Sequence, residues 1–185
     1  MTSSGSFFAH WRVRFGYPLA VAVFWLARPA PRTIIYGGLI GALGLLLRAY
    51  AAGYLHKQES LTVTGPYAHT RNPLYLGSAV LALGLAVITN SWLAALLIGA
   101  YFAVFYSIVM RREEAELRGH FGAAFEEYAR RVPLFFPRLF PARSGAPADS
   151  AFSWAQYKKN REYQAAIGFA LVLAVLLLIC SLRCR

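Results

Sequence analysis

Apolar residues form five long runs along the 185-residue chain, and most polar and charged residues collect in the segments between them. An α-helix needs about 20 apolar residues to cross the hydrocarbon core of a bilayer, and fewer where the membrane thins around it. The pattern therefore predicts an all-α integral membrane protein with about five transmembrane helices. The predicted spans lie near residues 15–27, 33–55, 74–89, 92–110 and 165–182.

The first apolar run has two interpretations because it is short. Phe15–Ala27 follows Arg12 and Arg14, as the core of a signal peptide would, but a short, tilted spanning helix fits as well. We favour the helix, because the Ala-Arg-Pro-Ala sequence of residues 27–30 is a poor cleavage site.

Glycines recur on neighbouring helical turns of the second run. Gly37, Gly38, Gly41, Ala42 and Gly44 would let another helix approach the backbone closely. They lack the order and the preceding strand of a dinucleotide-binding loop, so we interpret them as packing residues. Arg48 lies in the same run, and we expect it to snorkel towards the nearer membrane interface rather than to contact a ligand.

A polar turn leads into the third run. Gly65-Pro66 marks the turn, Asn72 suits a helix N-cap, and Pro73 suits the first helical position. The free N–H groups of that first turn, with Arg71 and Tyr75 beside them, would suit an anionic group such as a carboxylate. The connection at residues 90–91 is so short that the third and fourth runs must form an antiparallel hairpin.

A charged helical segment follows the fourth run. It begins at Arg111 and is expected to break near Gly119 and Gly122. The sequence of Leu134–Pro141 is typical of a segment at the membrane interface. We therefore divide the chain into a core at residues 1–142, which includes a cytoplasmic helical segment at 111–142, and an extension at 143–185. The extension consists of a linker, residues 143–150, and the last span.

Composition and charge fix the class and the orientation. Hydrophobic residues make up 58% of the chain, and the net charge is +11. In a soluble protein this charge would suggest nucleic-acid binding, but here the basic residues flank apolar runs and are better explained by membrane topology. In the five-span arrangement only Arg28, Arg32, Arg183 and Arg185 fall on the side opposite the N-terminus, apart from Arg48 inside a span. We therefore expect the N-terminus in the cytoplasm and the C-terminus on the opposite side.

The predicted hairpin brings two polar motifs to the same membrane face. Arg71, Asn72 and Tyr75 begin one helix, and residues 111–114 (Arg-Arg-Glu-Glu) end the other. Arginine can fork onto a carboxylate, and glutamate can accept from an ammonium or from ribose hydroxyls. An amino-acid moiety attached to a nucleoside would use both. Taken singly, each motif has a simpler explanation as a topology signal, a solvated face or a helix cap.

Together these motifs resemble the isoprenylcysteine carboxyl methyltransferase and phospholipid N-methyltransferase group of integral membrane enzymes. The resemblance covers about residues 61–137. It is carried by Gly65-Pro66-Tyr67, Arg71-Asn72-Pro73, Tyr75, Gly77, Arg112-Glu113-Glu114, Leu117, Phe121-Gly122, Tyr128 and Val132-Pro133.

The resemblance implies methyl transfer from S-adenosylmethionine, bound on the cytoplasmic side after the fourth span, to a lipophilic substrate that enters laterally from the bilayer. It implies catalytic roles for Arg71 and Glu114. It implies cofactor binding by Tyr67, Asn72, Tyr75, Arg112, Glu113 and Glu114.

Two residues depart from the family pattern. Asn72 stands where histidine is usual, which excludes a histidine base at that position although the amide can still form hydrogen bonds. Phe125 replaces a commoner tyrosine. A carboxylate acceptor needs no base, whereas an amine acceptor must be neutral, so Glu113 or Glu114 would then serve as the base. We expect no metal, because the sequence has no metal-ligand spacing and the chemistry needs none.

The identity of the acceptor stays open among an isoprenylcysteine-like carboxylate, a phospholipid amine and a small lipophilic amine or thiol. Two alternatives belong to other classes: a relative of NADPH-dependent membrane sterol reductases, and a non-enzymatic membrane subunit. We expect the protein in a bacterial inner membrane with no nucleic-acid partner. The last span would contribute to substrate access or to a homodimer.

Overall fold

The computed structural model describes residues 3–56, 60–142 and 151–183, with side chains from Arg14 onward. The predicted linker at 143–150 and the topology residue Arg185 lie outside these ranges, as does the side chain of Arg12. The described residues form helices, turns and irregular segments, with no strand among them. The elements are α1 (Ser3–Leu26), α2 (Pro31–Tyr54), the 3-10 turn η1 (Gly65–Ala68), α3 (Pro73–Thr89), α4 (Trp92–Phe121), α5 (Ala123–Arg131), α6 (Trp154–Lys159) and α7 (Tyr163–Arg183).

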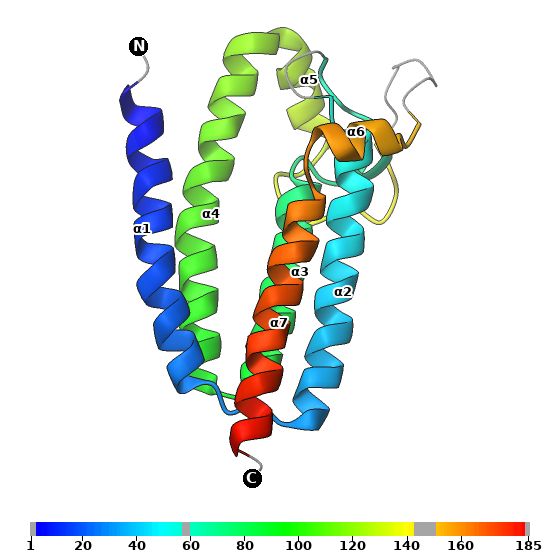
Figure 1. Ribbon diagram of the computed structural model, residues 1–185. Helices are drawn as coiled ribbons and strands as arrows, with labels where there is room; N and C mark the ends of the chain where they lie inside the picture. Colours follow the sequence, from blue (N-terminus) through cyan, green and yellow to red (C-terminus); the bar gives the residue numbers. More distant parts are fainter. Residues whose placement is uncertain (1–2, 57–59, 143–150, 184–185) are drawn as a thin grey trace.

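The long helices run alternately up and down. Figure 1 shows α1 and α3 running from the end of the molecule that carries the N-terminus, α2 and α4 returning to it, and α7 leading away to the C-terminus at the far end. The short helices α5 and α6 gather at the N-terminal end, beside the loop between α2 and α3. We call this end, which also carries residues 60–72, the loop end.

Three helices are long and apolar enough to cross a membrane: α2, α4 and α7. The apolar helices Arg14–Leu26 and Pro73–Thr89 are shorter. The prediction of an all-α membrane protein is confirmed, while the count of five spans stays a prediction. At 1.5 Å per residue, the 30 residues of α4 extend about 45 Å, so its last turns project beyond a hydrocarbon core of about 30 Å.

Helices α2 and α3 form the closest pair in the bundle because glycines face one another across it. A Cβ added at Gly84 would lie 2.5 Å from the Gly41 nitrogen and 2.6 Å from the Gly37 oxygen. One added at Gly44 would lie 2.7 Å from the Gly77 oxygen. These backbones leave no room for a side chain, so the predicted packing role is confirmed for Gly37, Gly41 and Gly44. It was wrong for Gly38, where an added Cβ would have no neighbour within 4 Å.

The charged segment after α4 departs from its predicted break points. Helix α4 runs unbroken through Gly119 and ends at Phe121, so a break near Gly119 was wrong. The break comes at Gly122, whose φ of 51° lies in the left-handed region that glycine adopts without strain. Helix α5 then folds back, and its buried side chains Phe125 and Tyr128 form a small core at the loop end together with Val132, the next residue after the helix.

The C-terminal helices attach to α2. The Ser153 nitrogen donates to the Gly53 oxygen at 3.0 Å, and the Asn160 side chain donates to the Ala52 oxygen at 2.8 Å. Arg48 of α2 forms an ion pair with Glu162, just before α7. Snorkelling of Arg48 was therefore the wrong interpretation, because its guanidinium is bound inside the protein.

Candidate functional site

The loop that carries the first polar motif is held by hydrogen bonds to the segment after α5. The Arg71 nitrogen donates to the Pro133 oxygen at 2.9 Å. The Thr70 hydroxyl donates to the Phe135 oxygen at 2.9 Å, and the Asn72 side chain donates to the Leu134 oxygen at 3.0 Å. This clamp fixes the backbone from which Arg71 projects.

Asn72 occupies the N-cap position of α3, and Pro73 is the first helical residue, as predicted. The Asn72 side chain makes no capping hydrogen bond, because its amide donates to the Leu134 oxygen instead. The Asn72 side chain therefore holds the loop through this hydrogen bond.

The hairpin of α3 and α4 brings the two polar motifs into contact. Arg71 forms an ion pair with Glu114, and the two side chains are only 15% and 16% exposed. One helical position earlier, Glu113 accepts a hydrogen bond of 2.6 Å from the Tyr75 hydroxyl. Because both contacts join residues some 40 positions apart, the predicted juxtaposition is confirmed, while the roles of these residues stay a prediction.

Tyr67 adds an unsatisfied polar atom to this cluster. The residue is 7% exposed, and its hydroxyl makes no hydrogen bond with any residue that the structure describes. Burial raises the pKa of Tyr67 well above that of free tyrosine, and nearby Tyr128 and Glu113 raise it further, so the hydroxyl stays protonated. The Nε atom of Arg71 is also buried without a hydrogen-bond acceptor among the described residues.

Unpaired buried donors are rare in folded proteins and call for an explanation such as a bound ligand. Two such donors, on Tyr67 and Arg71, stand beside the carboxylates of Glu113 and Glu114. The cluster can therefore bind a small molecule that presents both an anionic and a cationic or hydroxyl group.

Arg112 forms an ion pair with Glu116, one turn further along α4, at 3.1 Å, and its role in cofactor binding stays a prediction. The His69 ring contacts the Arg138 oxygen at 2.8 Å. In the described part of the chain, no group of three or more His, Cys, Asp or Glu residues could hold a metal ion.

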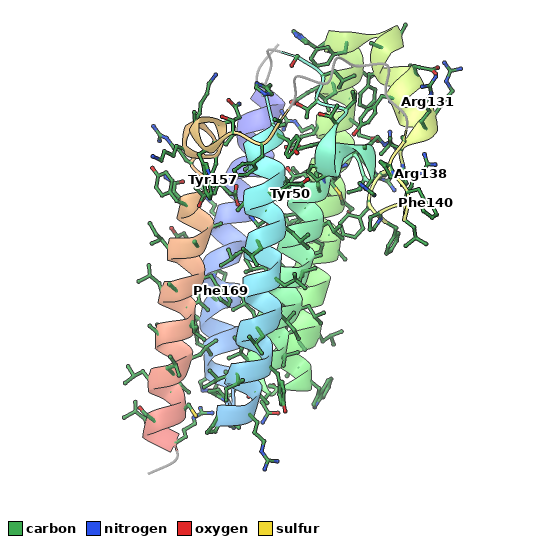
Figure 2. The ribbon with its side chains drawn as sticks, turned by 90° about the vertical axis from the view of Figure 1, so that its right-hand side faces the viewer. Tyr50, Arg131, Arg138, Phe140, Tyr157 and Phe169 are labelled. Atoms are coloured by element: carbon green, nitrogen blue, oxygen red, sulfur yellow. The ribbon has the colours of Figure 1, made fainter. Side chains whose placement is uncertain are left out.

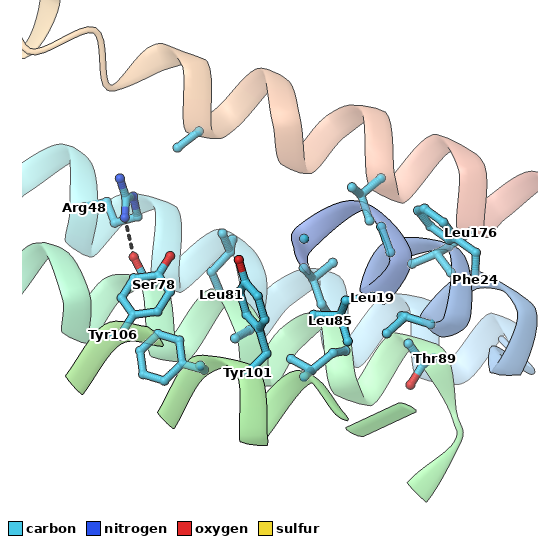
Figure 3. Close-up of a pocket in the computed structure, with 18 residues that line it drawn as sticks. Leu19, Phe24, Arg48, Ser78, Leu81, Leu85, Thr89, Tyr101, Tyr106 and Leu176 are labelled. Atoms are coloured by element: carbon cyan, nitrogen blue, oxygen red, sulfur yellow. Dashed lines mark hydrogen bonds between the residues drawn. The ribbon is translucent and has the colours of Figure 1, made fainter. Parts of the chain in front are cut away.

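A cavity of about 430 Å³ lies within the bundle among α1, α3, α4 and α7. Figure 3 shows Arg48, Ser78 and Tyr106 at one end of it and Phe24, Thr89 and Leu176 at the other. Arg48 donates to the Ser78 hydroxyl and pairs with Glu162, so this end is polar. The remaining lining is almost entirely aliphatic and aromatic.

The polar end of the cavity adjoins the cluster around Tyr67. The Tyr106 ring packs edge-on against the Tyr75 ring, with 5.3 Å between centroids, and Tyr75 binds Glu113. Glu162, the partner of Arg48, is close enough to Tyr67 to raise its pKa. An apolar compartment among the helices and a polar cluster at the loop end thus share a boundary.

Three residues of this arrangement were not predicted from the sequence. The Tyr128 hydroxyl donates to the Tyr67 oxygen at 2.8 Å and positions that loop. Ser78 and Glu162 complete the polar end of the cavity. The charge of Arg48 inside an apolar run was the signal that pointed to a partner, since a buried charge in a membrane segment is usually paired.

The model of the phospholipid methyltransferase family matches residues 32–124, about half of the chain. The cobalt-zinc-cadmium resistance protein CzcN of Cupriavidus metallidurans is 35% identical over 136 residues, which cover 70% of this chain and 62% of that protein. The nickel-cobalt-cadmium resistance protein NccN of Alcaligenes xylosoxydans xylosoxydans is 39% identical over 111 residues, which cover 57% of this chain and 52% of that protein.

A protein-S-isoprenylcysteine O-methyltransferase of Schizosaccharomyces pombe is 33% identical over 84 residues, which cover 45% of this chain and 36% of that protein. The chain thus spans about a third to three fifths of the length of these relatives. No solved structure matches it.

Proposed function

Because this chain belongs to the phospholipid methyltransferase family, we propose that it is a membrane enzyme that transfers a methyl group from S-adenosylmethionine to a lipophilic acceptor. The observation that carries the proposal is a pair of contacts across one hairpin, the ion pair of Arg71 with Glu114 and the hydrogen bond from Tyr75 to Glu113. The likeness to an isoprenylcysteine O-methyltransferase supports the same reaction class.

The residues of the cluster suit the cofactor. In this proposal the Arg71 guanidinium binds the carboxylate of S-adenosylmethionine. Glu113 and Glu114 accept hydrogen bonds from the ammonium or the ribose hydroxyls of the cofactor. The buried hydroxyl of Tyr67 donates to a further polar group, and Asn72 contributes its side-chain oxygen. Tyr75 orients Glu113. When bound, S-adenosylmethionine supplies an electrophilic methyl group on a sulfonium. Arg112, which also pairs with Glu116, would add a second guanidinium beside the carboxylates of the cluster.

The cavity suits the acceptor. A lipophilic molecule that enters from the bilayer would place its apolar part among the helices and its polar end near Arg48 and Ser78. The volume of about 430 Å³ is within the usual range for small-molecule sites. Holding acceptor and donor together away from water supplies much of the rate enhancement for a displacement of this kind. For an amine acceptor, Glu113 or Glu114 would remove the proton.

In this proposal residues 1–142 form the methyltransferase core, and residues 143–185 add Glu162 and the helix α7, which lines one side of the cavity. The excess of basic residues favours a cytoplasmic site. The two bacterial relatives favour a bacterial inner membrane. Their printed names concern metal resistance, and no property of the described residues extends that to this chain.

Calorimetric titration of the protein in lipid nanodiscs tests the proposal. S-adenosylhomocysteine should bind and raise the unfolding temperature, whereas NADPH should do neither. If the folded protein neither binds S-adenosylhomocysteine nor is stabilised by it, the proposal is contradicted. Binding of NADPH in its place would favour the reductase alternative.

A further inference from the structure

The segment between α5 and the undescribed residues exposes an unusual amount of apolar surface. Phe136, Leu139 and Phe140 are 80%, 91% and 78% exposed, although they lie outside the long helices that face lipid. A contiguous exposed apolar patch marks a site of interaction with a protein or a membrane. We call residues Leu134–Pro141 the apolar segment.

The apolar segment has a fixed position despite its exposure. Its backbone accepts hydrogen bonds from Thr70 and Asn72 on the site loop. The Arg138 nitrogen donates to the His69 oxygen at 2.9 Å, and the Ala142 nitrogen donates to the Ala68 oxygen at 2.9 Å. Exposed side chains on a fixed backbone form a preorganised surface, and this backbone is the one that holds Arg71.

The apolar segment also bends back to the depth of the membrane-spanning part of α4. The ring of Phe135 lies 6.4 Å from the ring of Phe102. Phe102 is nine residues, or about 13 Å, before Arg111, where the charged part of α4 begins. The ring of Phe135 therefore lies on the bilayer side of the level at which this helix becomes polar. A soluble partner at the loop end would not reach that depth.

Positive charge borders the apolar segment on its outer side. Figure 2 shows Arg131, Arg138 and Phe140 along one side of the molecule. Arg130 and Arg131 both form ion pairs with Glu127. Arg138 makes no ion pair with a described residue, and its guanidinium donates to the Arg131 oxygen at 2.6 Å. The guanidinium of Arg138 therefore keeps its positive charge uncompensated by a described carboxylate where headgroups would lie.

We propose that the apolar segment is a lipid anchor for the site loop. Phe136, Leu139 and Phe140 insert into the interfacial layer of the leaflet at the loop end, and anionic phospholipid headgroups bind at Arg131 and Arg138. Aromatic and aliphatic side chains with arginines above them are the usual composition of such interfacial elements. Through its hydrogen bonds to residues 68–72, the anchored segment stabilises the loop that carries Arg71.

The test uses a single fluorescent label in nanodiscs and needs no turnover. In a Cys180→Ala, Cys184→Ser background, Leu139→Cys and the matched control Ala124→Cys, exposed on α5, receive an environment-sensitive dye. Lipids brominated on the acyl chains should quench the label at position 139 several-fold more than the label at 124. Phe140→Cys repeats the measurement should the first variant fold poorly.

Headgroup charge is varied at a constant fraction of brominated lipid. Replacing phosphatidylcholine by phosphatidylglycerol should increase the quenching at position 139, and Arg138→Gln should remove that increase. Equal access of aqueous iodide to positions 139 and 124 would overturn the anchor. Equal quenching at position 139 in phosphatidylcholine and in phosphatidylglycerol would overturn the binding of anionic lipid. A Leu139→Ser, Phe140→Ser variant should increase hydrogen exchange at residues 68–72, and unchanged exchange would overturn the coupling to the site loop.

Discussion

At the scale of single residues, Glu114 is the strongest candidate for a functional side chain. Its carboxylate is largely buried and faces Arg71, so the pair costs desolvation that a purely structural contact at the surface would not incur. The Glu114 Oε1 atom lies within ion-pair distance of Arg71 but accepts no hydrogen bond from a described residue. It can therefore accept a hydrogen bond from another group.

Glu114→Gln should weaken binding of S-adenosylhomocysteine by about 2 kcal/mol, roughly thirtyfold in Kd, because the amide keeps the shape but loses the charge. Titration calorimetry measures the change. Glu116→Gln is the matched control, since it is the same substitution on the same helix at a position 64% exposed, and it should leave Kd unchanged. Equal effects of the two variants would contradict the assignment.

Tyr67→Phe should separate ligand binding from folding. Its hydroxyl has no partner among the described residues, and an unsatisfied buried group costs about 1–3 kcal/mol, so its removal should leave the ligand-free protein as stable or more stable. The same variant should show a smaller thermal shift with S-adenosylhomocysteine. Tyr128→Phe serves for comparison: it removes the 2.8 Å bond to the Tyr67 oxygen and should destabilise the ligand-free protein by about 1 kcal/mol. Loss of stability in Tyr67→Phe would argue for a structural hydroxyl.

The sequence predicted most of the candidate cluster but not how its members are used. Arg71, Tyr75, Glu113 and Glu114 could be placed together because a two-residue turn forces the hairpin to close. The bond from Asn72 to the Leu134 oxygen could not be predicted, because it depends on where a segment 62 residues later folds back. Local propensity carries no information about such a return.

At the scale of elements, α2 and α3 pack through their backbones. In a membrane, lipid removes most of the hydrophobic drive for helices to associate, so close packing at small residues contributes much of the stability. Gly37, Gly41 and Gly84 form one such contact, and Gly44 and Gly77 form another. The motif at the start of α3 is thereby held against α2.

Gly84→Ala should therefore destabilise the bundle by about 1–3 kcal/mol, the usual cost of forcing a methyl group into a filled interface. Thermal unfolding in nanodiscs measures this. Gly38→Ala is the matched control. Gly38 lies in the same glycine-rich stretch of α2, but a Cβ added there would have no neighbour within 4 Å, so this substitution should leave the stability unchanged. A neutral Gly84→Ala would show that α2 and α3 separate more easily than this geometry requires.

The ion pair between Arg48 and Glu162 joins α2 to the start of α7. Arg48→Ala leaves Glu162 buried without its partner and should cost about 3 kcal/mol in unfolding free energy. Replacing both residues, as Arg48→Met with Glu162→Leu, removes the unpaired charge and should restore most of that stability. Chemical unfolding of the three proteins measures it. A double variant as unstable as the single one would mean that the pair itself holds α7.

Element boundaries followed from the sequence where a residue has one clear local preference. Pro73 starts α3 and Gly122 ends α4, as their backbone preferences dictate. Gly119 did not end the helix, because a glycine on an exposed helical face costs only about 1 kcal/mol, which a 30-residue helix tolerates. The attachment of α6 and α7 to α2 was missed, because the partners are about 100 residues apart and share no pattern.

At the scale of the whole molecule, the fold separates two environments. Apolar helices with a cavity among them occupy one part, and the charged cluster, α5 and the apolar segment occupy the loop end. Among described residues, the far end carries Arg28, Arg32 and Arg183 as its basic residues near helix termini, whereas basic residues are abundant at the loop end. A charge asymmetry of this kind predicts that the richer end faces the cytoplasm, because cytoplasmic loops carry an excess of Lys and Arg.

Cysteine labelling in cells tests this orientation. In the background without native cysteines, Gly119→Cys marks the loop end, where an added side chain meets nothing within 4 Å, and Trp92→Cys marks the far end, where the residue is 79% exposed. A membrane-impermeant maleimide should label position 92 in intact spheroplasts and position 119 only in inside-out vesicles. The reverse pattern would place the candidate site outside the cytoplasm, away from the cellular supply of S-adenosylmethionine, and would therefore contradict the proposed function together with the topology.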